Sequence, residues 1–216
     1  MSLKIPEEFI KYVFEDRRKV IELITSGKKP RNFFVEFTRH TPAIISYGPA
    51  GINGSIKGVG FVLKREFLEG VTRKLEEFLK SQVESVEGSV EYWGEAEEAR
   101  VKALKLLLKE VYVKERIDFT LLSSIELAKK HSWINFKANP VATILFFTPP
   151  AISYEVRAEV EIHEKGIYWR YVNAVHDVFH LAGARKLRDW SKTPVYIFKI
   201  KEIYDNSPRK MGEKIL

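Results

Sequence analysis

Regular alternation of apolar and polar side chains from Tyr154 to His163 constrains the fold of this chain more than any other feature of its sequence. The apolar positions are Val156, Ala158, Val160 and Ile162. Because successive side chains of a β-strand point to opposite faces, the pattern predicts a half-buried antiparallel strand. The run from Ala142 to Phe147, which is apolar and rich in β-branched and aromatic residues, predicts a second strand directly before it.

Helical periodicity marks other parts of the chain. The segment from Ile5 to Ser26 repeats apolar residues three and four positions apart, which predicts an amphipathic N-terminal helix. Between Arg65 and about Val111, two further apolar stripes predict a pair of helices. A last helix is predicted from Ala174 to Ala182.

Further strand signals surround these helices. They cover Phe33 to Thr38, Ala43 to Tyr47, Ser55 to Lys64 and Val195 to Ile203, with a hairpin turn at Asn53-Gly54. Since strand signals resume at Ile117 after the helical pair, we predict a single domain, residues 1–216, with a helical insertion at about 65–111. The expected class is α+β: an antiparallel β-barrel or strongly curved sheet with an N-terminal helix.

The net charge of the chain limits the classes of ligand that it is expected to bind. Its 36 Lys and Arg residues exceed its 29 Asp and Glu residues, and the formal net charge of +7 suits a small anionic ligand. Acidic and basic residues are well mixed along the sequence, so nucleic-acid binding is not favoured. The chain has no cysteine, which excludes thiolate nucleophiles and cysteine-ligated metals. Any metal must be held by histidines and carboxylates.

No segment has the pattern of a membrane anchor. The sequence lacks a run of the roughly 20 apolar residues that a spanning helix needs, and its first residues lack the apolar core of a signal peptide. A cytoplasmic location is therefore expected. Many Lys, Glu and Arg residues, few Met and no Cys also resemble the composition of thermophile proteins.

A segment rich in hydroxyl and cationic side chains precedes the two clearest strands. Ser123-Ser124 is followed by Lys129-Lys130 and then by Trp133. A phosphate needs several convergent donors, which hydroxyls, ammonium groups and a helix N-terminus can supply. In the alternative interpretation, Ser123 or Ser124 caps a helix from Ile125 to Lys130, both lysines are solvated, and Trp133 belongs to the core.

A second candidate site is the sequence from His176 to His180. On a helix these two histidines, four residues apart, lie on one face and can ligate one divalent cation. The candidates for a third ligand are His163, Glu161 and Glu159, which share the polar face of a preceding predicted strand. Asp177 stands where the zinc-protease pattern has Glu, which weakens that analogy. In the alternative interpretation the helix is structural and its histidines are partly exposed.

Other catalytic motifs do not occur in the sequence. No serine has a Gly-x-Ser-x-Gly setting. The glycines from Gly48 to Gly60 match neither the Walker loop nor the Gly-x-Gly-x-x-Gly fingerprint of nucleotide-binding proteins. Arg39-His40, between two threonines, is a further potential anion contact.

Parts of the chain resemble the FMN-binding split-barrel family, the pyridoxamine-phosphate-oxidase-like proteins. The matching residues are Ser123, Lys129 or Lys130, Asn135-Phe136, Asn139-Pro140, Val141 to Phe147, Tyr154 to Gly166 and Pro194 to Tyr204. The resemblance covers well under half of the chain. It implies a six-stranded antiparallel barrel, a homodimer with FMN at the interface, and a phosphate held by Ser123, Ser124, Lys129 and Lys130, with Trp133 as an aromatic neighbour of the ring.

The leading functional prediction is therefore a split-barrel-like protein that binds FMN or a similar phosphorylated ligand, with oxidoreduction as the chemistry that the resemblance implies. One alternative is a metal-dependent hydrolase built on His176, His180 and either a carboxylate or His163. The other is a structural or interaction protein without a ligand. Whether the chain is an enzyme stays open at this point.

Overall fold

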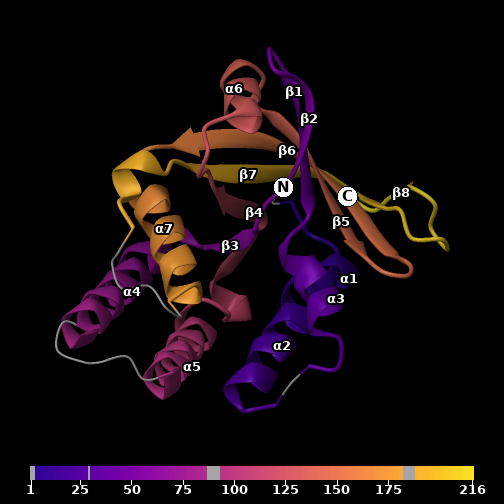
Figure 1. Ribbon diagram of the computed structural model, residues 1–216. Helices are drawn as coiled ribbons and strands as arrows, with labels where there is room; N and C mark the ends of the chain where they lie inside the picture. The colour runs from indigo at the N-terminus through magenta and orange to yellow at the C-terminus, as the bar shows by residue number, and fades with distance from the viewer. Residues whose placement is uncertain (1–2, 29, 87–92, 182–187) are drawn as a thin grey trace.

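Long antiparallel strands form the centre of the molecule (Figure 1). The computed structural model describes residues 3–28, 30–86, 93–181 and 188–216. Within these ranges, eight strands form one sheet in the order β2-β1-β5-β6-β7-β4-β3, with β8 added to β7, and all neighbours are antiparallel. The strands are β1 (Ala43–Gly48), β2 (Gly51–Ile56), β3 (Gly60–Leu63), β4 (Ile117–Ile125), β5 (Val141–Thr148), β6 (Ile152–His163), β7 (Val195–Asp205) and β8 (Glu213–Lys214).

The predicted α+β class and the split-barrel-like antiparallel sheet are confirmed. The hydrogen-bonded path runs from β2 to β3 without closing, so the described sheet is curved but open.

The predicted alternation along β6 appears directly in its burial. Tyr154, Val156 and Val160 are buried, whereas the intervening charged side chains lie on the outer face. Glu159 on that face lies 2.8 Å from the ammonium of Lys201 in β7. The neighbouring strand β7 is buried on both faces at its start, which explains why its sequence there is apolar without alternation.

The helices cover the sheet from two sides. The N-terminal helix is continuous through α1 (Glu7–Ile10), a π-helical turn η1 (Lys11–Glu15) and α2 (Asp16–Thr25). In Figure 1, helices α4, α5 and α7 lie together on one side of the sheet, and α2 runs beside α5. The remaining elements are α3 (Phe33–Phe37), η2 (Thr38–His40), α4 (Arg65–Val86), α5 (Trp93–Glu110), η3 (Lys114–Arg116), α6 (His131–Ala138), α7 (Ile167–Phe179) and η4 (Trp190–Lys192).

Several local predictions were wrong. The segment from Phe33 to Thr38 is helical, because a short apolar run does not distinguish a strand from a helix. The turn of the hairpin is formed by Pro49-Ala50, where Gly48 pairs with Gly51. The predicted turn residues Asn53-Gly54 instead lie inside β2. The buried amide of Asn135 fixes this turn, since it accepts the N–H of Ala50 and donates to the carbonyl of Gly51.

Two helix boundaries also differ from the prediction. No helix runs from Ile125 to Lys130, because the chain leaves β4 at Ile125 and the next helix begins at His131. The helix predicted from Ala174 to Ala182 begins earlier, at Ile167, and ends at Phe179. Ala182 lies outside the described residues, as does the middle of the insertion, residues 87–92.

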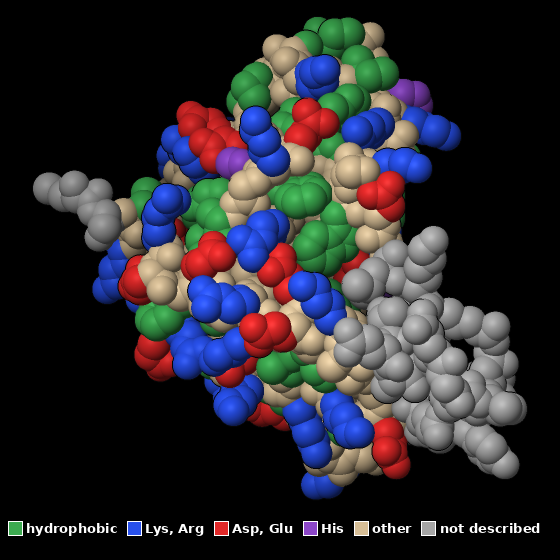
Figure 2. Space-filling model, turned by 90° about the vertical axis from the view of Figure 1, so that its left-hand side faces the viewer, with side chains coloured by type: hydrophobic (Ala, Val, Ile, Leu, Met, Phe, Trp, Pro, Cys, Tyr) green, Lys and Arg blue, Asp and Glu red, His purple; other side chains and the backbone are tan. Residues whose placement is uncertain are grey.

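The surface mixes charges of both signs. Figure 2 shows lysine and arginine side chains interspersed with aspartate and glutamate over the face that it displays. Among the described residues, no helix combines the length and the apolar character needed to cross a bilayer.

Candidate functional site

Ser123 and Ser124 lie within β4 and are buried, each with 3% of its surface exposed. Ser123 pairs with Gly60 of β3, where an added Cβ would lie 3.3 Å from the serine hydroxyl. The glycine therefore leaves room for that hydroxyl. Since neighbouring side chains of a strand point to opposite faces, the two hydroxyls lie on different sides of the sheet.

The segment after β4 is organised around the buried carboxylate of Glu126, which is 2% exposed. One of its oxygens accepts the backbone N–H groups of Ala128 and Lys129, both at 2.8 Å. The other accepts the ammonium of Lys57 at 2.9 Å and the hydroxyl of Tyr196 at 2.8 Å. Burial acts to raise the pKa of Glu126, but these donors, Lys57 foremost, hold it below its ordinary value. The backbone N–H groups of this segment, which were candidate donors to a phosphate, thus donate to a carboxylate of the same chain.

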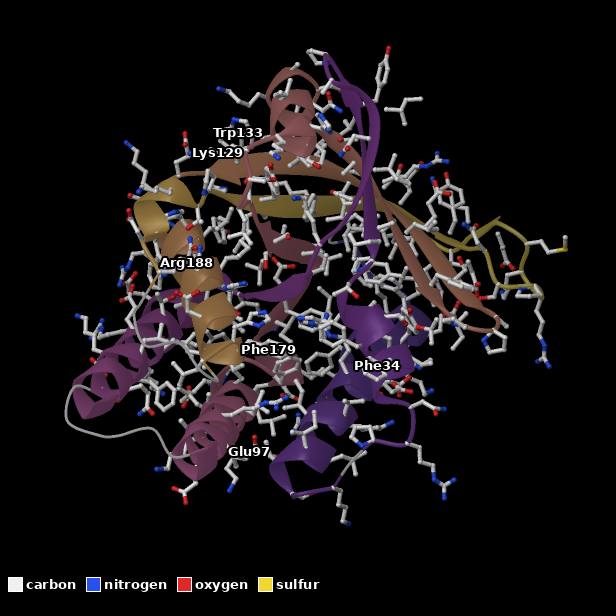
Figure 3. The ribbon with its side chains drawn as sticks, viewed as in Figure 1. Phe34, Glu97, Lys129, Trp133, Phe179 and Arg188 are labelled. Atoms are coloured by element: carbon white, nitrogen blue, oxygen red, sulfur yellow. The ribbon has the colours of Figure 1, made fainter. Side chains whose placement is uncertain are left out.

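The cationic part of the predicted phosphate site lies elsewhere. Lys129 and Lys130 are exposed, and the ammonium of Lys129 lies 3.8 Å from Glu164 and 5.3 Å from the ring centre of Trp133. Figure 3 shows Lys129 and Trp133 close to α6 and well apart from Phe179. The structure therefore separates Lys129 and Trp133 from Phe179 at the C-terminal end of α7.

A cavity of about 370 Å³ lies where the N-terminal helix, η2, β3, β4 and the C-terminal half of α7 meet. Its wall contains two of the five residues of the predicted phosphate site and two of the three predicted metal ligands, without Lys129, Lys130, Trp133 or His163. The polar residues in its wall include Arg17, His40, Ser123, Ser124, His176 and His180. The serines of one predicted site and the histidine pair of the other thus meet at one place.

A second cavity of about 310 Å³ adjoins the first. Both are lined by Arg17, His40, Tyr112, Phe179 and His180, so these side chains form a shared wall.

Three histidines of the larger cavity form a cluster with Phe179. The ring centres of His176 and His180 are 4.5 Å apart, and the ring of His40 stacks on Phe179 at 4.9 Å. Burial lowers the pKa of His180, and the neighbouring His176 adds to this effect. Burial also lowers the pKa of His40 well below its ordinary value, together with the charge of Arg17 and the nearby histidines. The imidazoles of His40 and His180 are therefore predominantly neutral at pH 7.

Asp177 positions the end of α7 and is not one of the residues that line the cavity. Its carboxylate accepts the guanidinium of Arg188 at 2.9 Å and the indole N–H of Trp190 at 2.7 Å, and it lies 3.0 Å from Nδ1 of His176. Burial acts to raise the pKa of Asp177, but these partners hold it below its ordinary value. A carboxylate with so many donors orients His176 and is a poor general base.

The structure does not bring His163 to the histidine pair. His163 lies at the end of β6, 3.3 Å from Glu161 and against the ring of Tyr168. In the described part of the chain, no group of three or more His, Asp or Glu side chains is placed to hold a metal.

Arg17 was not among the residues predicted from the sequence, and His40 was only a minor candidate. Arg17 follows Ile10 and Phe14 and precedes Ile21 at alternating spacings of four and three, so it occupies a position of the apolar stripe of the N-terminal helix. An arginine at such a position is the signal that could have found it, because it predicts a buried cation.

Comparison with known proteins adds a weak likeness. No family model matches the chain, and no curated protein matches it. Among solved structures, a pyridoxamine 5'-phosphate oxidase-related, FMN-binding protein from Nostoc punctiforme is 8% identical, with a TM-score of 0.47 over 98% of this chain and 87% of that chain. HupZ from Group A Streptococcus is 12% identical, with a TM-score of 0.44 over 80% of this chain and 89% of that chain.

HutZ, a heme storage protein from Vibrio cholerae, is 10% identical, with a TM-score of 0.41 over 83% of this chain and 97% of that chain. The resemblance to the FMN-binding split-barrel family is thus weak, as the sequence indicated. At these identities and TM-scores the likeness says nothing about the ligand of this chain.

Proposed function

We propose that this protein binds FMN or a similar phosphorylated ligand in the larger cavity, whose wall includes Ser123, Ser124, His176 and His180. The cavity itself carries the proposal. Its volume of about 370 Å³ lies in the range of ligand pockets. Its wall is largely apolar and contains a few convergent polar groups, among them histidines with lowered pKa values, and such groups gather at functional sites.

The residues present fit a flavin. A planar ring needs apolar and aromatic neighbours, which Val175 and Phe179 supply, and hydrogen-bond partners at its edge, which the neutral imidazoles supply. FMN, when bound, supplies hydride and electron transfer, so an oxidoreductase is the activity that we propose. The role of this chain is to exclude water from the ring and to donate or accept protons at the imidazole nitrogens.

Retention of FMN tests the proposal. We expect the purified protein, incubated with FMN and passed through a gel-filtration column, to keep visible flavin absorbance. Val175→Trp, which places a larger side chain in the cavity wall, should abolish this absorbance. Val141→Trp is the matched control, because Val141 is 48% exposed and does not line the cavity. A wild-type protein that keeps no flavin, or equal retention in both variants, would contradict the proposal.

A metal-dependent hydrolase stays the alternative, favoured by the 4.5 Å separation of the His176 and His180 rings. In that case His176→Ala would lose a copurifying metal, measured by elemental analysis. The homodimer and the cytoplasmic location both stay predictions, and sedimentation velocity measures the first of them.

A further inference from the structure

Arg17 is a buried cation without a carboxylate partner. Only 5% of its surface is exposed, and no ion pair involves it in the part of the chain that the structure describes. Its guanidinium donates to the carbonyl of Val59 at 3.0 Å, to the hydroxyl of Tyr112 at 3.3 Å and to Nδ1 of His40. All three acceptors are neutral. The guanidinium therefore keeps its net charge among the described groups to which it donates.

Arg39 shows how the same chain treats another buried guanidinium. It is 7% exposed, pairs with the carboxylate of Glu36, and lies 4.0 Å from that of Asp16. Each of the two arginines also lies over an aromatic ring, Arg17 over Phe61 at 4.9 Å and Arg39 over Tyr12 at 5.1 Å. The two sites therefore match in burial and aromatic contact and differ in the presence of carboxylates.

The position of Arg17 connects this charge to the cavities. Arg17 lines both of them. In the larger one, the charges of Lys57 and Glu126 neutralise each other across 2.9 Å. His40 accepts a hydrogen bond from Arg17 on Nδ1, which requires that nitrogen to be unprotonated. The wall of the larger cavity consequently keeps one uncompensated positive charge.

We propose that Arg17 is the receptor for an oxyanion, a phosphate or carboxylate group of the ligand that occupies this cavity. A buried charge is costly unless an opposite charge compensates it, and no group of the described chain does so here. The planar guanidinium suits phosphate and carboxylate oxygens, which accept hydrogen bonds from two of its nitrogens at once. The inference rests on the proposed use of the cavity as a ligand site, and it places the anion at the N-terminal helix and away from Lys129 and Lys130.

Two flavins that differ only in the phosphate test this assignment. We would measure the affinities of FMN and riboflavin for the wild-type protein, Arg17→Met and Arg39→Met by quenching of flavin fluorescence. The wild-type protein and Arg39→Met should prefer FMN, whereas Arg17→Met should lose this preference by a factor of about ten or more, as expected for a hydrogen bond to a charged group. Arg17→Gln, which keeps donors without the charge, replaces Arg17→Met if that variant does not fold.

The outcomes separate this inference from the proposed function. Equal affinities of the wild-type protein for both flavins, or an unchanged preference in Arg17→Met, would overturn the role of Arg17 while leaving flavin binding intact. If neither flavin binds, the FMN proposal fails, and the role of Arg17 is then tested by whether inorganic phosphate stabilises the protein. Phosphate, compared with chloride at equal ionic strength, should raise the Tm of the wild-type protein and of Arg39→Met but not of Arg17→Met. No rise in the wild-type protein would overturn the inference.

Discussion

Replacing Glu126 with glutamine should lower the free energy of unfolding by about 3 kcal/mol, because removing one partner of a buried ion pair leaves the other charge uncompensated. Lys57 would be that charge, since its side chain is only 15% exposed and its ammonium lies 2.9 Å from Glu126. The glutamine amide would also accept fewer hydrogen bonds than the carboxylate, which accepts four, among them those from Ala128 and Tyr196. Urea unfolding at pH 7 measures the effect.

Glu164→Gln is the matched control for Glu126. Glu164 pairs with Lys129 at 3.8 Å, and both side chains are exposed, so the loss of this pair should change the free energy of unfolding by less than about 0.5 kcal/mol. Equal stabilities of the two variants would show that the segment after β4 does not depend on its internal carboxylate.

Acid should remove the stabilisation that Glu126 gives the wild-type protein. The folded-state pKa of Glu126 is below its ordinary value of 4.5, so its contribution is fully present above pH 4.5 and is lost as the pH falls through the folded-state pKa. The difference in stability between the wild-type protein and Glu126→Gln should therefore shrink in acid. A difference that stays constant with pH would contradict this account.

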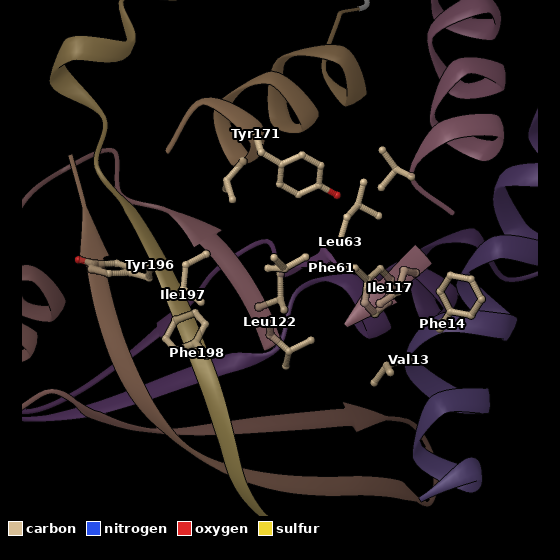
Figure 4. Packing of buried hydrophobic residues seen from close by; sticks show 14 of the residues in the cluster. Val13, Phe14, Phe61, Leu63, Ile117, Leu122, Tyr171, Tyr196, Ile197 and Phe198 are labelled. Atoms are coloured by element: carbon tan, nitrogen blue, oxygen red, sulfur yellow. The ribbon is translucent and has the colours of Figure 1, made fainter. Parts of the chain in front are cut away.

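Phe14→Ala should cost about 3 to 5 kcal/mol, the usual range for truncating a buried aromatic side chain. Phe14 is 1% exposed, and its ring lies 5.4 Å from those of Phe61 and Phe119. Figure 4 shows it beside Ile117, where the N-terminal helix meets the sheet. Because this helix also carries Arg17, flavin affinity should fall together with stability.

Leu23→Ala tests whether the stability lost in Phe14→Ala reflects the contact of Phe14 with the sheet. Leu23 lies on α2 and is 38% exposed, so its truncation should change the free energy of unfolding much less than that of Phe14. Thermal or urea unfolding compares the two variants. Similar losses would mean that the N-terminal helix does not owe its stability to the packing of Phe14.

The strands with the strongest local pattern were predictable from the sequence. The alternation from Tyr154 to His163 and the apolar run into Phe147 fixed β6 and β5, because one face of each strand packs against the core. The turn at Pro49-Ala50 was not predictable, since it depends on the amide of Asn135, which reaches it from another element. For the same reason Asn53-Gly54, a favoured hairpin pair, lies inside a strand instead.

The candidate site was predictable only in fragments. Ser123 and His176 were each selected by local sequence, but their common cavity depends on the packing of α7 against β3 and β4, which no local pattern specifies. The lysines after β4 were selected for their ammonium groups, which the cavity wall does not include. The sequence also does not show that Glu126 accepts the backbone N–H groups of this segment. Arg17 was missed because a basic run within a helix is usually solvated.

The most direct test of the ligand site is the imidazole NMR spectrum of the five histidines before and after addition of FMN. His40, His176 and His180 line the cavity, whereas His131 and His163 do not. We predict that the resonances of the first three shift and that those of the other two stay in place. Shifts confined to His131 and His163, which lie toward Lys129 and the segment after β4, would place the ligand outside the cavity and contradict the account.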